Sequence, residues 1–155
     1  MSNLVNLRIK DCSMCASLPS IGQLPFLKYL FIRRIARVKS MGSKFYGNGC
    51  SAPFPSLETL CFQDMQEWEE WIPHGSGKSD EGLADLRELS LVSCSKLQRT
   101  LLEYLPSLET LVIRKCEQLL VSILSLPTLR KLIVNGCKEV VGKGNQPQLI
   151  QLSGS

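Results

Sequence analysis

The sequence predicts an α/β solenoid, an open horseshoe-shaped arc of stacked coils with a parallel, concave β-sheet and a mostly irregular convex side. Two observations lead to this fold class. A pattern of four apolar positions recurs six times along the 155 residues. A further apolar position, usually followed by proline, precedes each of the last five copies at a constant distance. Self-similarity at periods of roughly 20–50 residues is typical of solenoids.

Each copy of the pattern reads as apolar, two variable residues, apolar, one variable residue, apolar, two variable residues, and then apolar or Cys. The alternating part predicts a half-buried strand, which cannot form a core alone. We therefore expect successive strands to stack about 4.8 Å apart, pair in parallel and align their leucines in columns. The copies are Leu4-Leu7-Ile9-Cys12, Leu27-Leu30-Ile32-Ile35, Leu57-Leu60-Phe62-Met65, Leu86-Leu89-Leu91-Cys94, Leu108-Leu111-Ile113-Cys116 and Leu129-Leu132-Val134-Cys137.

The entry to each strand has its own signal, three residues before the first leucine of the copy. A proline follows this position in four copies, which suits a strand entry because no hydrogen-bond donor of the sheet is lost there. The entry residues are Leu24, Phe54, Leu83, Leu105 and Leu126, and the prolines are Pro25, Pro55, Pro106 and Pro127.

These repeats predict a single domain over residues 1–152, with a partial seventh repeat from about residue 149. Residues 36–53 and 66–85 are expected to be long insertion loops. The second one contains Trp68 and Trp71 in an acidic run. These tryptophans could be a hot spot for a partner, or anchor the loop against the convex side. The anchor is the favoured interpretation because a buried indole contributes more than an aliphatic side chain.

Composition limits the classes of function. No apolar run approaches the roughly 18 residues of a membrane helix. Seven cysteines, an odd number, and the lack of Asn-x-Ser/Thr sites favour a reducing, cytoplasmic setting. The net charge of +4 conceals an asymmetry: residues 1–50 carry eight basic groups and one acid, whereas residues 51–85 carry eight acids and one lysine.

Three stretches, residues 18–28 (LPSIGQLPFLK), 54–60 (FPSLETL) and 65–71 (MQEWEEW), resemble the leucine-rich repeats of plant intracellular nucleotide-binding immune receptors of the coiled-coil class. The resemblance covers about residues 1–142. It implies a fragment of a larger receptor that senses pathogen effectors or modified host proteins and helps to hold the receptor inactive. The parent receptor would bind ADP or ATP in a module absent from this chain. The alternative is the substrate-binding repeat region of an F-box ubiquitin-ligase adaptor, which shares the cysteine after the strand.

No catalytic, cofactor or metal site is predicted, so we do not expect an enzyme. Cys12, Cys94, Cys116 and Cys137 share one repeat position and are interpreted as buried fillers, because a linear column does not give tetrahedral zinc coordination. Cys12 and Cys15 have the spacing of a redox pair but lack its strand-then-helix context. Residues 75–79 (GSGKS) resemble the end of a phosphate-binding loop, but Ile72 replaces its first glycine. His74 has no catalytic partners.

The predicted interaction surface is the concave face, where the fourth and sixth residues after each first leucine point outward. Apolar residues there would be unusual on a solvated face and favour contact with a protein, although β-propensity also explains the branched ones. The cluster Arg8, Lys10, Lys28, Arg33, Arg34, Arg37 and Lys39 is either a solvated face or a site for an acidic protein partner. We expect neither nucleic-acid nor membrane binding. The candidate contact residues are Arg8, Lys10, Phe31, Arg33, Arg34, Val112, Arg114 and Ile133.

Overall fold

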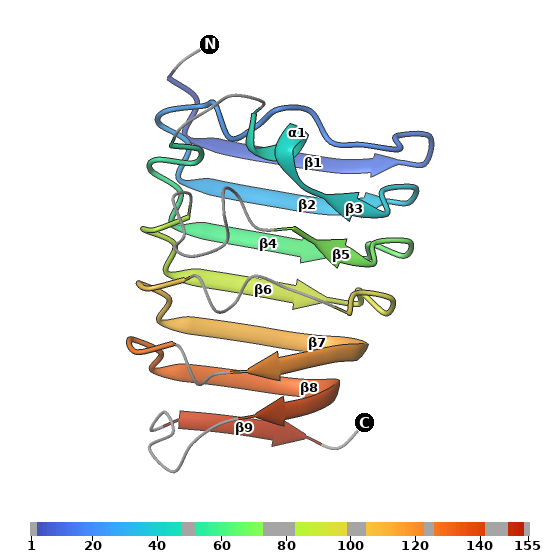
Figure 1. The fold of residues 1–155 in the computed structure, drawn as a ribbon, viewed down its shortest axis with the longest axis vertical. Helices are drawn as coiled ribbons and strands as arrows, with labels where there is room; N and C mark the ends of the chain where they lie inside the picture. Colours follow the sequence, from blue (N-terminus) through green and yellow to red (C-terminus); the bar gives the residue numbers. More distant parts are fainter. Residues whose placement is uncertain are drawn as a thin grey trace.

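A computed structural model describes residues 3–47, 52–72, 83–98, 105–122, 126–141 and 149–153. Its main feature is a seven-stranded parallel sheet in the order β1-β2-β4-β6-β7-β8-β9 (Figure 1). We number the coils 1 to 6 from the repeats that begin at residues 4, 27, 57, 86, 108 and 129. The strands of this sheet are β1 (Asn6–Cys12), β2 (Tyr29–Ile35), β4 (Thr59–Gln63), β6 (Glu88–Val92), β7 (Thr110–Ser122), β8 (Lys131–Val141) and β9 (Leu149–Ser153).

The predicted leucine column is confirmed by the register of this sheet. Leu30 lies opposite Leu60, and the column continues through Leu89, Leu111 and Leu132 on the following strands. All five side chains are buried, with exposed fractions of 0–1%. Strand β9 pairs in the same register, so the chain from residue 149 does supply a seventh strand.

Coil 1 is packed more loosely than the coils that follow. Its first leucine, Leu4, is 39% exposed, whereas the first leucines of coils 2 to 5 are fully buried. Leu7 and Ile9 are only partly buried. The reason is that a coil buries its apolar positions against both neighbours, and in the described residues coil 1 has one neighbour, on the β2 side.

Strands β4, β6, β7 and β8 each begin after a tight turn. The N–H of Leu108 donates to the carbonyl of Leu105, and equivalent bonds close the turns that precede Leu57, Leu86 and Leu129. These turns use the predicted entry positions, where proline has the right φ for the second residue of a β-turn.

Seven residues after the first leucine of each copy, the backbone turns left-handed. This conformation favours Gly, Asn and Asp and costs other residues roughly 1–2 kcal/mol. Here it is adopted with φ between 54° and 58° by five non-glycine residues and with φ of 85° by Gly136. The five are Asp11, Arg34, Asp64, Ser93 and Lys115.

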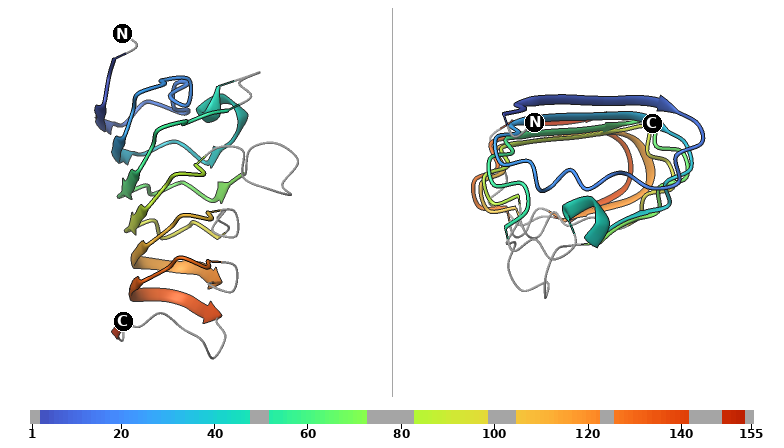
Figure 2. Two further views of the ribbon diagram at one scale, coloured as in Figure 1. Left: turned by 90° about the vertical axis from the view of Figure 1, so that its left-hand side faces the viewer. Right: turned by 90° about the horizontal axis from the view of Figure 1, so that it is seen from above.

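The return segments opposite the sheet contain more strand than predicted. Strand β3 (Ser40–Met41) pairs in parallel with β5 (Glu70–Trp71), and β7 and β8 bend at the edge of the sheet where the other strands end and pair again beyond Cys116 (Figures 1 and 2). The only helix of the described residues is α1 (Ser43–Tyr46). The α/β assignment was therefore wrong in its helical part, because extended chain crosses the same distance in fewer residues than a helix does.

An aromatic core fills coils 2 and 3. Trp68 and Trp71 are 0% and 2% exposed, which confirms them as anchors of the return segment. Their indole N–H groups donate to the carbonyl of Glu70, at 2.7 Å, and to the hydroxyl of Tyr46, at 3.1 Å. Ring centroids of neighbouring members lie 4.5–6.3 Å apart, which is the usual range for aromatic pairs. The cluster consists of Phe45, Tyr46, Phe54, Phe62, Trp68 and Trp71.

Gly22 lets coil 1 approach this core. A Cβ atom at residue 22 would collide with the backbone of Tyr46. The N–H of Gly22 donates to the carbonyl of Phe45, and the carbonyl of Gly22 accepts from the N–H of Phe54.

Because α1 has only four residues, no helix in the described part of the chain is long enough to cross a bilayer.

Candidate protein-interaction surface

The solvent side of the seven-stranded sheet, here called the outer face, carries the predicted contact positions in rows across the strands. The register places Arg8 beside Phe31 and Lys10 beside Arg33. At the other end of the sheet, Val112 lies beside Ile133 and Arg114 beside Asn135. The alternation of buried and less buried residues along β4 and β6 shows why these positions face outward: the leucine columns take every second residue.

The predicted residues form two groups rather than one patch. The first group lies on β1 and β2, where the Arg8 guanidinium carbon sits 4.5 Å from the centre of the Phe31 ring, a cation–π contact. The second group lies on β7 and β8. Cys61 and Ser90 separate them in the same row, so Phe31 and Val112 are three strands, or about 14 Å, apart.

Phe31, Val112 and Ile133 are only half-buried. Each therefore offers part of its apolar surface to solvent, flanked by exposed basic residues: Arg8, Lys10 and Arg33 at one end of the sheet and Arg114 at the other. In the row of Phe31 and Val112, the middle of the face is formed by the small side chains of Cys61 and Ser90. Burial raises the pKa of the Cys61 thiol, so this group is a neutral filler and not a reactive thiolate.

Arg34 lies beside the outer face, at the left-handed position near the end of β2. Its Nη1 atom is 3.3 Å from Asp11 Oδ1, and its Nε atom is 3.7 Å from Asp64 Oδ2. The guanidinium thus bridges coils 1 and 3. Because all three side chains are substantially exposed, we assign this ladder a small contribution to stability. Arg34 differs from Arg33 in that its charge is already matched.

The outer face has a third row, two residues after each first leucine, which was not among the predicted contact positions. Tyr29 is its largest member, 38% exposed, and Thr59 Oγ1 donates to Glu88 Oε1 at 3.1 Å. The same alternation that identified the fourth and sixth positions also points the second one outward, so the signal was present. The row runs through Asn6, Tyr29, Thr59, Glu88, Thr110 and Lys131.

The basic cluster of the first two coils is divided by the fold. Arg8, Lys10 and Arg33 face outward from the sheet, and Lys28 lies at the strand entry. Arg37 and Lys39 lie on the return side, where they line a separate hollow with Lys44. One stretch of basic sequence therefore gives two positively charged surfaces on different sides of the stack.

The cysteine column mostly fills the ends of the strands as predicted. Cys116 lies opposite Cys137, and Cys116 Sγ is 3.4 Å from the carbonyl oxygen of Leu91. The hydrogen bond that Cys94 shares with Cys116, together with burial, raises the pKa of Cys94. Cys94 and Cys116 are buried and act as weak donors inside the core, whereas Cys137 is only half-buried. Among the described residues, no three His, Cys, Asp or Glu side chains gather in a way that could hold a metal ion.

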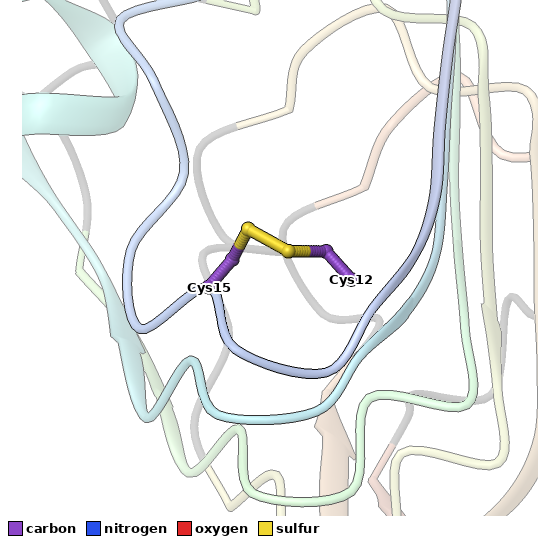
Figure 3. Close-up of a disulfide and its surroundings, with 2 residues drawn as sticks. All are labelled: Cys12 and Cys15. Atoms are coloured by element: carbon purple, nitrogen blue, oxygen red, sulfur yellow. A yellow bond between two sulfur atoms is a disulfide. The ribbon is translucent and has the colours of Figure 1, made fainter.

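Cys12 is not a free thiol, because it forms a disulfide with Cys15 (Figure 3). The interpretation of the whole cysteine column as free fillers was therefore wrong at this position. The turn after β1 brings the two Cα atoms to 5.6 Å, within the range that a disulfide spans. This bond is unexpected for a chain assigned to a reducing compartment.

The candidate phosphate-binding segment, residues 75–79, and His74 lie outside the residues that the structure describes.

Comparison with known proteins identifies two relatives, both from Arabidopsis thaliana. The chain is 40% identical over 121 residues to "Putative disease resistance RPP13-like protein 1" and 33% identical over 117 residues to a second "Putative disease resistance protein". The matches cover 74% and 73% of this chain but only 11% and 8% of the relatives. No protein-family model and no solved structure matches the chain. At this level of identity, the chain is homologous to a short region of plant disease resistance proteins.

Proposed function

We propose that this chain is a leucine-rich-repeat solenoid that recognises a protein through the outer face of its sheet, as part of a cytoplasmic plant immune receptor. The proposal includes an autoinhibitory role, in which the same face binds another module of the receptor until a pathogen effector or a modified host protein competes. The observation that carries it is the chemistry of the outer face: half-buried Phe31, Val112 and Ile133 stand among exposed basic groups that have no carboxylate within 4 Å in the part of the chain that the structure describes.

Two physical arguments support a protein ligand. Phe31 and Arg8 form an aromatic and arginine pair, and aromatic and arginine residues are enriched at binding hot spots. Arg8, Lys10, Arg33 and Arg114 have no carboxylate within 4 Å among the described residues. An acidic partner would therefore gain new charge pairs and would be steered to this face. The relatives, which are described as disease resistance proteins, supply the biological setting.

The test uses the full-length receptor that contains this region, expressed in leaves. Arg33→Glu reverses one charge of the outer face. Lys138→Glu makes the same change at an exposed position beyond the bend of β8, and serves as the matched control. We expect Arg33→Glu to cause cell death without a pathogen or to abolish the response to one, and Lys138→Glu to behave as the unmodified receptor. If Arg33→Glu changes neither readout at equal protein level, the outer face is not the recognition surface.

A further inference from the structure

The return side of coils 1 and 2 contains a strand with an unused edge. On one side, β3 is joined to β5: the N–H of Glu69 donates to the carbonyl of Lys39 at 2.7 Å, and that of Ile72 to the carbonyl of Met41 at 2.8 Å. The ladder continues to coil 4 through the bond from Gln98 N–H to the carbonyl of Glu69. On the other side of β3, no described backbone group of coil 1 pairs with it.

Strand geometry identifies the unpaired groups. In a parallel ladder, alternate residues direct both their N–H and C=O groups to the same neighbour. Lys39 and Met41 direct their carbonyls toward β5, so the N–H and C=O of Ser40 point the opposite way, toward coil 1. Ser40 is exposed, and one donor and one acceptor of its backbone are therefore available to an added strand.

Coil 1 leaves space for such a strand. Seen along the stack, its return segment follows an inner path and does not lie over those of the next coils (Figure 2). The turn closed by Cys12 and Cys15 lies at the beginning of this path (Figure 3). The result is a hollow of about 850 Å³ between Ser17 of coil 1 and Ser40. Sites of roughly 300–1,000 Å³ commonly accept ligands.

The hollow is positively charged. Arg37, Lys39 and Lys44 line it, and Lys44 Nζ donates to Ser17 Oγ at 3.1 Å across its width. None of the three has a carboxylate within 4 Å among the described residues. Glu67 also lines the hollow, but its carboxylate is 3.3 Å from Lys96 Nζ. The three cations are thus available to a ligand with several negative charges.

From the free edge and the charge together, we propose that an extended acidic protein segment binds in this hollow as a third strand beside β3. Its backbone pairs with the N–H and C=O of Ser40, and its carboxylates contact Arg37, Lys39 and Lys44. Strand addition of this kind takes affinity from main-chain bonds and specificity from alternate side chains, and charge-assisted bonds to the cations strengthen it. This site is separate from the outer face and does not depend on the function proposed above.

The test measures binding of a fluorescent peptide of alternating Glu and Val, seven residues long, to the 155-residue chain by anisotropy at low salt. We expect saturable binding that Arg37→Gln with Lys39→Gln weakens about tenfold through loss of two charged contacts. The matched control, Arg130→Gln with Lys138→Gln, removes the same charge at exposed positions that belong neither to the hollow nor to the predicted contact residues, and should leave the affinity unchanged. Absence of binding, or the reverse ranking of the two double variants, would overturn the proposal.

A second arm separates strand addition from simple charge attraction. Ser40→Pro removes only the donor that faces the hollow, at an edge position that tolerates proline, and should weaken binding roughly two- to tenfold, as expected for one net hydrogen bond. Ser40→Ala should not. A peptide methylated on alternate amides makes the same test with the unmodified chain. If neither change matters, or if a single-stranded oligonucleotide binds more tightly than the peptide, the hollow is not a site for an extended acidic segment.

Discussion

Coils 2 and 3 and coils 5 and 6 have the same sheet but different return sides. In coils 2 and 3, whose repeats are 30 and 29 residues long, the return holds an aromatic core, α1 and the short β3–β5 pair. In coils 5 and 6, the strand itself continues around the bend and is packed by residues such as Leu119 and Val121. The comparison teaches that the four-position pattern determines the sheet, whereas repeat length determines how the opposite side is filled.

The largest expected effect concerns the aromatic core. Trp71→Ala removes a buried indole and the bond from its N–H to Tyr46, and should lower the free energy of unfolding by about 3–5 kcal/mol. Val121→Ala, at a buried position of the bent strand β7, removes two methyl groups and should cost about 1.5–2 kcal/mol. Denaturant unfolding of both variants measures the difference. Equal losses of unfolding free energy in the two variants would contradict the idea that the return side of coils 2 and 3 is packed differently from that of coils 5 and 6.

The sheet side should respond equally in both regions. Leu60→Ala in coil 3 and Leu111→Ala in coil 5 each remove a fully buried leucine of the same column. We expect a loss of roughly 2–5 kcal/mol for each, with the two values within about 1 kcal/mol, because their neighbours on both sides are leucines. The same unfolding measurement decides this, and strongly unequal losses would show that the return side also determines packing at the sheet.

A smaller effect is expected for the disulfide of coil 1. A bond that closes a loop this short stabilises by about 2 kcal/mol according to chain entropy. Reductant should therefore lower the protection of β1 amides against hydrogen exchange, while β6 amides keep theirs. The variant Cys12→Ser with Cys15→Ser is the control, since it must not respond to reductant. An equal response in β1 and β6 would mean that coil 1 is not a separate unit of stability.

The smallest effect tests the left-handed positions, which both regions share. Lys115 adopts φ of 54° without the tolerance of Asn or Gly for this conformation. Lys115→Asn should raise the free energy of unfolding by about 0.5–1 kcal/mol, and Gly136→Ala should lower it by about 1 kcal/mol. Thermal unfolding of the two variants is sufficient. A loss of stability in Lys115→Asn, or a gain in Gly136→Ala, would indicate that the side chains at these positions make contacts that outweigh the backbone preference.

The sheet could be predicted from the sequence because each of its strands carries its own apolar alternation. The β3–β5 pair could not, since Ser40–Met41 and Glu70–Trp71 are too short for a periodic signal. Their pairing depends on two successive long repeats bringing them to the same position around the coil. The continuation of β7 beyond Cys116 was hidden for a similar reason: the register changes between Cys116 and Leu120, which interrupts the alternation.

The outer face was predictable to the same degree. Arg8, Phe31 and Val112 follow directly from the alternation, and so does the overlooked Tyr29. Arg34 does not, because a left-handed residue departs from the two-residue period and directs its side chain along the stack toward Asp11 and Asp64. The separation of Arg37 and Lys39 from Arg33 also depends on the path of the chain after β2, which no local pattern specifies.

The left-handed position has a consequence for how such a surface changes over time. Five residue types, from aspartate to arginine, occupy it in six coils without disturbing the leucine columns beside it. A change of charge at this position, at the rim of the sheet, therefore leaves the fold intact, and its main cost is the left-handed backbone conformation of one residue. Engineered or natural variants can alter what this rim attracts while the architecture beneath stays constant, which makes it a suitable place to diversify a library.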